Sequence, residues 1–293
     1  MLVLHFHRSS ARHAEPLATP VTMAAARPAE RVRRERSQRR PADADVVWRE
    51  LTTEVAPAVE RFDPATLRDL PDPARRFLGR VLPEGAPLAM ATTLSQSGEI
   101  RLGKRWMPFT ADQLLVAGAG FVWKPVVGSG LMRVTGSDVL TAAGAAMDFR
   151  LWGLVPVARG SGPDVTRSAI GRLVAETVAW LPQALTPQAG AVWTPVDHRR
   201  AVVRLAALGE SVDVEVTVGD DGRLRSLSLD RWSDRLDPPG FEPFGAHVDG
   251  ELTGPDGVVI AGAGTGGWGW DTPQWPDGAF YRYTVDEAHP LGI

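Results

Sequence analysis

The sequence predicts an α+β protein in which a large, curved, half-barrel-like antiparallel sheet holds a central amphipathic helix, with further helices before the sheet. Three observations support this prediction. After residue 85, apolar and polar side chains alternate in short runs that glycine or proline interrupts, as in antiparallel strands. One long segment in the middle of the chain has helical periodicity instead. The runs also follow one another directly, without the helices that parallel βαβ units need.

The first 44 residues differ from the rest of the chain. They hold nine arginines, between Arg8 and Arg40, and show no sustained apolar periodicity. The opening MLVLHFH is too short for a signal-peptide apolar region of about 7 to 15 residues. The run RVRRERSQRR could bind nucleic acid, but a solvated tail or a start codon assigned too early is the simpler interpretation. We expect a disordered arginine-rich tail over residues 1–44 and a single domain over residues 45–293.

Composition narrows the classes of partner and cofactor. The net charge of -3 gives no argument for nucleic acid or an anionic membrane as partner. Cysteine is absent, which excludes disulfides, thiolate metal sites and a cysteine nucleophile. His198, His247 and His289 have no partners at metal-ligand spacing. We therefore expect a cytoplasmic protein with no metal, no cofactor and no transmembrane segment; the sequence does not indicate its oligomeric state.

Two short helices are expected before the sheet. The first covers residues 45–55 and buries Val47, Leu51 and Val55. The second begins after Asp72, which has the short side-chain oxygen of an N-cap, and Pro73 fits the first helical position. Its apolar stripe includes Phe77.

About ten strands are expected after these helices. A hairpin is predicted over residues 88–106, with its turn at Ser97 and Gly98. The clearest hairpin has the turn GDDG at residues 219–222, and valines alternate on one face of the strand before it. The strand-like runs are 88–96, 99–106, 113–116, 120–127, 131–134, 145–157, 201–208, 211–218, 223–232, 246–252, 257–263 and 279–285.

The central helix is predicted over residues 166–181. Its apolar residues recur at spacings of three, four and one, which a single core-facing stripe requires. Asp164 or Thr166 is the expected N-cap. The stripe consists of Ile170, Leu173, Val174, Val178 and Leu181.

The opposite side of this helix carries Ser168, Arg172 and Glu176, and Arg172 and Glu176 are neighbours at a spacing of four. Spacing alone favours a solvated polar face. The alternative is a buried ionic network that Arg159, Asp164 or Asp148 could join, which would suggest a role other than stability. Acid–base chemistry by the carboxylates is possible in principle if burial shifts their pKa values.

Two further patterns could indicate a binding site. Residues 262–267 read GAGTGG, but WGWDTPQWP follows and cannot begin the helix that a dinucleotide fingerprint needs. The chain also has ten tryptophans. Most are expected in core packing, although Trp268, Trp270 and Trp275 lie in glycine- and proline-rich sequence and could cap a cavity mouth.

Five segments carry a resemblance to a known family. They read LPDPARRFLGRVLPEGAPL, GEIRLGKRWMPFTADQLL, GFVWKPVV, LWGLVPVARGSGPDVTRSAIGRLVAETV and GGWGWDTPQW. Together they resemble a functionally uncharacterised, actinobacterial-type family of bacterial proteins over about residues 70–285. The outline is also similar to lipoprotein-carrier half-barrels, as fold analogy only. The family resemblance implies that certain positions are characteristic: Trp106, Phe109, Trp123, Asp164, Ser168, Arg172 and Glu176.

These observations lead to one hypothesis and two alternatives. We expect a soluble protein that binds a small, mainly apolar ligand or a lipid between the curved sheet and the central helix. A hydrolase or isomerase using Asp148, Glu176 or Ser168 is the first alternative, and a purely structural or interaction domain is the second. Convergence of carboxylates with arginine in an open cleft would favour an enzyme, whereas a closed ion-pair network would favour structure. The expected ligand-binding residues are Trp106, Trp123, Arg159, Ser168, Arg172, Glu176 and Trp268.

Overall fold

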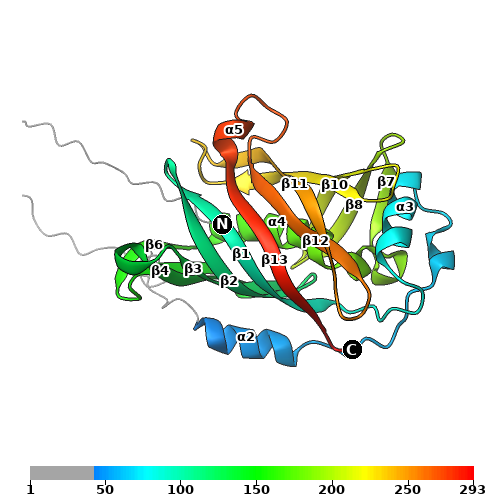
Figure 1. The fold of residues 1–293 in the computed structure, drawn as a ribbon, viewed down its shortest axis with the longest axis horizontal. Helices are drawn as coiled ribbons and strands as arrows, with labels where there is room; N and C mark the ends of the chain where they lie inside the picture. The colour runs from blue at the N-terminus through cyan, green and yellow to red at the C-terminus, as the bar shows by residue number, and fades with distance from the viewer. Residues whose placement is uncertain (1–42) are drawn as a thin grey trace, which may run out of the picture.

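The computed structural model describes residues 43–293, and residues 1–42 of the predicted tail lie outside this range. One antiparallel sheet of 13 strands curves around a long helix (Figure 1). The strands are β1 (Ala91–Leu102), β2 (Arg105–Val116), β3 (Gly120–Val127), β4 (Val134–Thr141), β5 (Gly144–Leu151), β6 (Val155–Ser161), β7 (Val192–Pro195), β8 (Arg200–Ala207), β9 (Glu210–Val218), β10 (Leu224–Ser233), β11 (Gly240–Thr253), β12 (Val259–Trp268) and β13 (Ala279–Leu291). The α-helices are α2 (Ala44–Thr53), α3 (Asp72–Val81), α4 (Pro163–Trp180) and α5 (Trp275–Gly278), and the 3-10 turns are η1 (Pro64–Leu67), η2 (Gly130–Met132), η3 (Pro182–Leu185) and η4 (Pro187–Ala189).

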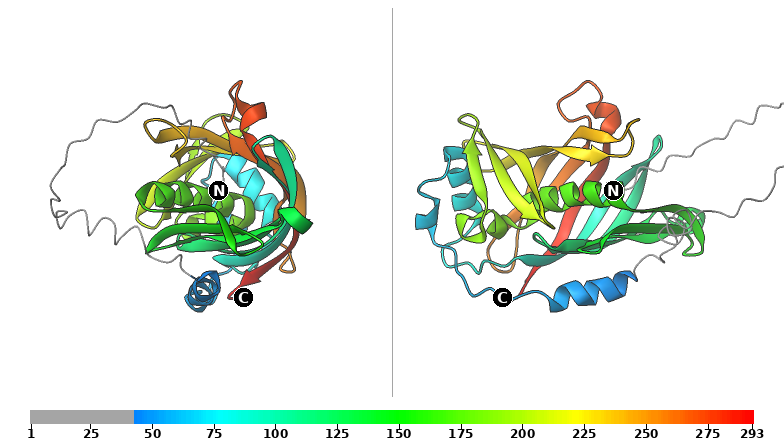
Figure 2. Two further views of the ribbon diagram at one scale, coloured as in Figure 1. Left: turned by 90° about the vertical axis from the view of Figure 1, so that its left-hand side faces the viewer. Right: turned by 180° about the vertical axis from the view of Figure 1, so that it is seen from behind.

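The strand order explains how α4 comes to lie inside the sheet. The order is β6-β5-β4-β3-β2-β1-β13-β12-β11-β10-β9-β8-β7, so every neighbouring pair except β1–β13 is consecutive in the chain. The link from β6 to β7 must therefore carry the chain from one edge of the sheet to the other. Helix α4 makes this crossing on the concave side (Figure 2). The predicted fold class is confirmed.

Helix α4 is buried on almost every side, which corrects the expectation of a single buried stripe. It contacts β10 and β9 near one edge of the sheet and β5 and β6 near the other. Small residues let the strands approach the helix: Ala169, Gly171, Ala175 and Ala179 are all buried. The helix begins after Gly162, and neither Asp164 nor Thr166 is its N-cap. Asp164 instead accepts a hydrogen bond from Trp232 Nε1 at 2.9 Å.

The two predicted N-terminal helices are present and pack in different places. Phe77 and Val81 of α3 are buried, and this helix contacts β7, β8, β9 and β12 at one end of the concave side. In α2, Val47 and Leu51 are buried in a separate small cluster over β3 and β4. The N-cap of α3 is Pro71, one residue before the expected Asp72, whose carboxylate pairs with arginines one turn later in the same helix.

Most predicted strands are confirmed, with three corrections. The GDDG turn joins β9 to β10 as expected. Gly98 is not a turn but lies inside β1, and the hairpin turns after Leu102 instead. The run predicted over residues 145–157 is divided into β5 and β6, and residues 131–134 are mostly the turn η2. Within residues 43–293 no helix is both long and apolar enough to span a membrane; the expected cytoplasmic location stays a prediction.

Candidate functional site

A buried ionic network lies beneath the middle of α4. Arg172 is only 3% exposed, and its Nε donates to Glu176 Oε1 at 2.6 Å. Its Nη1 donates to Asp138 Oδ2 on β4 at 2.7 Å. Glu176 also accepts from Gln113 Nε2 on β2 at 2.6 Å. The helix is therefore tied through polar side chains to two strands of the sheet, and the interpretation of this helix side as a solvated face is wrong.

Strand register explains why these side chains meet. Gln113 on β2 is opposite Trp123 on β3, and Trp123 is opposite Asp138 on β4. Directly opposite residues of antiparallel strands point to the same face. All three side chains consequently line the concave face in one row below Arg172. The Arg172 guanidinium carbon lies 5.2 Å from the Trp123 ring centroid, which adds a cation–π contact.

The network is arranged to hold charge rather than to transfer protons. Burial alone would lower the pKa of Arg172, but Glu176 and Asp138 outweigh this effect and the pKa is raised. The guanidinium therefore stays charged and paired with two carboxylates. Because both Glu176 oxygens accept hydrogen bonds from protein groups, this carboxylate is poorly placed to act on a substrate.

Asp148 belongs to a second, more exposed cluster on β5 and β6. It accepts from Arg150 Nη2 at 2.8 Å and from Arg159 Nε at 3.1 Å. Burial alone would raise the pKa of Asp148, but the hydrogen bonds from the two arginines outweigh it and the pKa is lowered. A carboxylate held ionised in this way is a weak candidate for a general acid. Arg159 is half exposed and directed to Asp148.

A groove opens where β9 and β10 separate. Their ladder extends from the Leu224–Val218 pair to the Ser228–Glu215 pair and stops there. Beyond this point β9 continues with β8, and β10 continues with β11. The first half of α4 lies beside the gap. The sheet is thus split on one side, and helix α4 partly fills the split.

The groove is open to solvent on one side and offers about 190 Å³ between α4, β9, β10 and β11. Its apolar walls include Ile170, Val212 and Trp232. Phe241 lies at the mouth with 57% of its surface exposed. Arg167 of α4 covers the aromatic side, since its guanidinium carbon is 4.6 Å from the Trp232 ring centroid. The remaining lining residues are Gly171, Glu210, Ser211, Asp213, Asp230 and Arg231.

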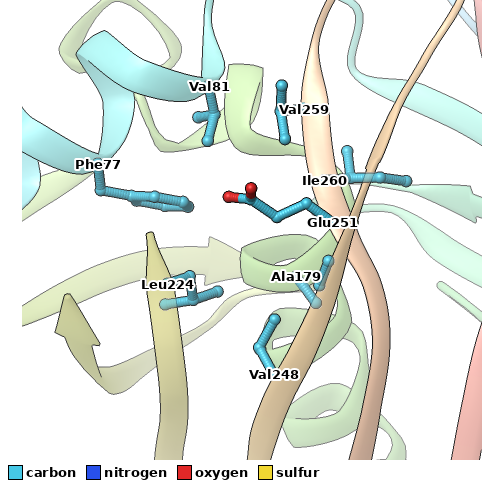
Figure 3. Close-up of a pocket in the computed structure, with 9 residues that line it drawn as sticks. Phe77, Val81, Ala179, Leu224, Val248, Glu251, Val259 and Ile260 are labelled. Carbon is cyan, nitrogen blue, oxygen red and sulfur yellow. The ribbon is translucent and has the colours of Figure 1, made fainter. Parts of the chain in front are cut away.

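A second cavity, between α3 and β12, is much smaller. It holds only about 10 Å³, close to the space needed for one water molecule. Phe77 and Val81 form one side, and the Glu251 carboxylate extends between them and Ile260 (Figure 3). Arg80 Nη2 donates to Glu251 Oε2 at 2.7 Å. A volume of about 10 Å³ leaves no room for an organic ligand.

The structure brings some predicted site residues together and separates others. Trp123, Arg172 and Glu176 belong to one network. Trp106 is on the convex face, where Arg282 and Arg101 stack against it. Arg159 is on β6.

Ser168 and Trp268 both contact Arg231, a residue that the sequence analysis did not identify. Arg231 Nε donates to the Ser168 carbonyl at 2.9 Å, and the Arg231 guanidinium lies over the Trp268 ring. The binding roles of the seven expected ligand-binding residues stay predictions.

The glycine-rich segment and the tryptophans after it are also placed. GAGTGG lies within β12, a strand. Trp270 and Trp275 pack against each other and against His247, with ring centroids 4.9 Å apart for the two indoles. Trp270 and Trp275 do not line the groove or the small cavity described above. These two cavities therefore give no support to the expectation that the indoles cap a cavity mouth.

The fold and the site define a class: an α+β protein with a curved antiparallel sheet around a buried, ion-paired helix and a groove at the sheet's split. Within this class, the chain belongs to DUF6544, a family of unknown function whose model matches residues 60–280. No curated protein matches it in sequence.

Two solved structures have a similar outline. A DUF1329 family protein from Desulfovibrio piger is 10% identical, with a TM-score of 0.40, over 78% of this chain and 94% of that one. A LolA superfamily protein from Nitrosomonas europaea is 8% identical, with a TM-score of 0.41, over 75% of this chain and 91% of that one. Both likenesses are too low to support an inference about function.

Proposed function

We propose that this protein binds a small, mainly apolar ligand in the groove between α4 and β9–β11. The groove carries the proposal, because it provides about 190 Å³ beside Ile170, Val212 and Trp232. Cavities of about 150 Å³ with apolar walls accept ligands as large as benzene. Larger ligand pockets of about 300 to 1,000 Å³ are more usual, so we expect a compact ligand or one that partly projects from the mouth.

The location differs from the original expectation in one respect. The concave face beneath residues 173–180 is filled by the helix and by buried core side chains. The larger of the two cavities described above lies beside the first half of α4, where Gly171 has no side chain and the strands diverge. The proposal therefore concerns the split edge of the sheet rather than its whole concavity.

The alternative of a hydrolase or isomerase has weaker support. It requires carboxylates that converge in an open cleft, but Glu176 is held by Arg172 and Gln113 beneath the helix. Asp148 is held by two arginines on the far edge of the sheet. These pairings favour structural roles for both carboxylates.

Native mass spectrometry tests the proposal, with extraction of any small molecule that co-purifies. We expect a bound molecule near one per chain, or binding of 1-octanol and 4-phenyl-1-butanol in ligand-observed NMR. Val212→Trp should abolish either signal by filling the groove. Val202→Trp is the matched control, because Val202 is opposite Glu215 on the other face of the same strands. Absence of any bound molecule together with no response to either alcohol would reject the proposal.

A further inference from the structure

Arg231 is a buried cation whose hydrogen bonds are incomplete. It lies on β10, is 1% exposed and lines the groove. Its Nε donates to the Ser168 carbonyl, but Nη1 and Nη2 have no hydrogen-bond partner among residues 43–293. Buried guanidinium groups are normally paired, because an unpaired buried charge loses its hydration without compensation. The N–H groups on Nη1 and Nη2 are therefore free to donate to an acceptor outside these residues.

The surroundings of Arg231 stabilise its charge without accepting its hydrogen bonds. Its guanidinium carbon lies 4.9 Å from the Phe244 ring centroid and 5.0 Å from that of Trp268. Aromatic faces attract a cation but leave its in-plane N–H groups unpaired. Burial lowers the pKa of Arg231 to about 10, so the side chain is still charged at neutral pH. Trp268 Nε1 is a further buried donor without a partner in the described chain.

Arg172 shows that this chain pairs a buried arginine where the role is structural. The Arg172 side chain extends from α4 toward the sheet, the Arg231 side chain extends from β10 toward α4, and both have aromatic neighbours. Arg172 has two carboxylates within 2.7 Å, whereas Arg231 has none within ion-pairing distance in the described residues. Glu242 is directly opposite Arg231 in the β10–β11 ladder, yet its nearest cation is Arg235, at 3.7 Å.

The backbone leaves room for the Arg231 side chain to reach this position. A Cβ atom at position 171 would lie 3.0 Å from Arg231 Cγ, so the glycine permits the arginine to pass beneath the helix. Arg231 therefore lines the groove, while its guanidinium lies against the rings of Phe244 and Trp268. Among the described residues, Arg231 is the one that both lines the groove and carries buried donors without a partner, whereas Phe244 and Trp268 do not line it.

We propose that Arg231, with Trp268 Nε1, binds the carboxylate of a small organic acid whose apolar part lies in the groove. This inference rests on the proposed function and adds the chemical class of the ligand. A carboxylate is planar and can accept two parallel N–H bonds from a guanidinium.

The acidic residues at the groove do not cancel this preference. Asp213 is held by Arg204 through two hydrogen bonds of 2.7 Å. Glu210 and Asp230 are exposed at the rim, where water and salt weaken their field. Their negative charge would slow the entry of an anion. The buried guanidinium attracts the bound anion strongly, because the surrounding medium has low polarity.

The test compares acids with alcohols of the same shape at pH 7. Octanoate and 4-phenylbutyrate are titrated beside 1-octanol and 4-phenyl-1-butanol by calorimetry or ligand-observed NMR. We expect each acid to bind about tenfold to a hundredfold more tightly than its alcohol, as a charge-assisted bidentate pair would give. Arg231→Met should bring this ratio close to one, and Arg231→Lys should retain part of it. Arg225→Met, on the outward side of the same strand, is the matched control and should leave the ratio unchanged.

The outcomes separate this inference from the proposed function. Equal affinities for acid and alcohol in the unaltered chain would overturn the inference and leave the groove proposal standing. An acid preference that persists in folded Arg231→Met would also overturn it. Binding of no compound would reject the proposed function and the inference with it. If Arg231→Met does not fold, Trp268→Phe removes one donor and should reduce the ratio by a smaller factor; an unchanged ratio there would count against the site.

Discussion

Arg172 Nη1 donates to Asp138 Oδ2 at 2.7 Å, and this bond ties the middle of α4 to β4. The same guanidinium pairs with Glu176, so one buried cation serves two carboxylates. Arg231, under the same helix, serves none among the described residues. The two arginines are equally buried but differ in pairing, and their substitutions should therefore have different effects on stability.

Replacing Arg172 with methionine should destabilise the protein by about 3 to 5 kcal/mol, because two buried carboxylates lose their cation. Replacing Arg231 with methionine should change the free energy of unfolding by about 1 kcal/mol or less, and could increase it, since no carboxylate is left unpaired and only the bond to the Ser168 carbonyl is lost. Urea denaturation of both variants beside the unaltered chain measures the difference. Equal losses would show that Arg231 has structural partners comparable with those of Arg172.

The tyrosines give a pH-dependent prediction. The chain has two, Tyr281 and Tyr283, and both are buried. Burial raises the pKa of both phenols, and the negative charge of Glu176 raises it further. Unfolded tyrosine ionises near pH 10, so above this pH the unfolded state loses protons that the folded state keeps. The stabilising contribution is complete below about pH 10 and is lost as pH rises from there toward the folded pKa values.

Ultraviolet absorbance of tyrosinate measures this directly, because no other tyrosine contributes. We expect no tyrosinate signal in the folded protein until the alkaline unfolding transition, and then both residues should ionise together. Circular dichroism at each pH locates that transition. The Tyr281 hydroxyl donates a hydrogen bond to Gln96 Oε1 at 3.1 Å on the concave face. Ionisation of either tyrosine near pH 10 in the folded protein would mean that water reaches this face beside Gln96.

The Arg167 side chain provides a prediction about access to the groove. It stacks on Trp232 and Phe241, with its guanidinium carbon 4.6 and 5.1 Å from the two ring centroids. It is exposed, and such cation–π contacts contribute about 0.5 to 1 kcal/mol. Arg167→Ala should therefore cost at most about 1 kcal/mol in stability while accelerating both entry and exit of a groove ligand. Stopped-flow measurement with 4-phenylbutyrate checks the rates; slower or unchanged exchange would show that Arg167 does not cover the mouth.

Local patterns in the sequence predicted the sheet, the helices and the Arg172–Glu176 pair, because each depends on residues a few positions apart. The partners of that pair could not be predicted in this way: Asp138 and Gln113 are 34 and 63 residues before Arg172 and Glu176, respectively. Their meeting depends on strand register. Arg231 was missed for a related reason. It follows Leu227 and Leu229 on the inward face of β10, where alternation leads one to expect another apolar residue.

Gly98 shows that a glycine between strand-like runs can be required for close strand packing rather than for a turn. A glycine after serine between strand-like runs predicts a hairpin turn. In the structure it lies inside β1 with a φ of +150°, and a Cβ there would be 2.0 Å from the Arg282 carbonyl oxygen. Strand β13 approaches β1 too closely for a side chain. The turn itself uses Gly103, which has a φ of +63° and open space around it.

These two glycines form a matched pair for substitution. Gly103→Ala should cost about 1 kcal/mol, the usual cost of a left-handed backbone conformation for a residue with a side chain. Gly98→Ala should cost clearly more, roughly 3 kcal/mol or above, because the new methyl group meets backbone atoms of β13 that cannot move without breaking the β1–β13 ladder. Thermal and urea unfolding of the two variants measure the difference in stability.

Hydrogen exchange gives a second contrast between the two variants. The β1–β13 pairing joins the strands that are first and last in the chain, so Gly98→Ala should increase hydrogen exchange along both strands. Gly103→Ala should affect only the hairpin tip. Equal costs with no change in exchange would show that the two strands can separate locally to accept a side chain.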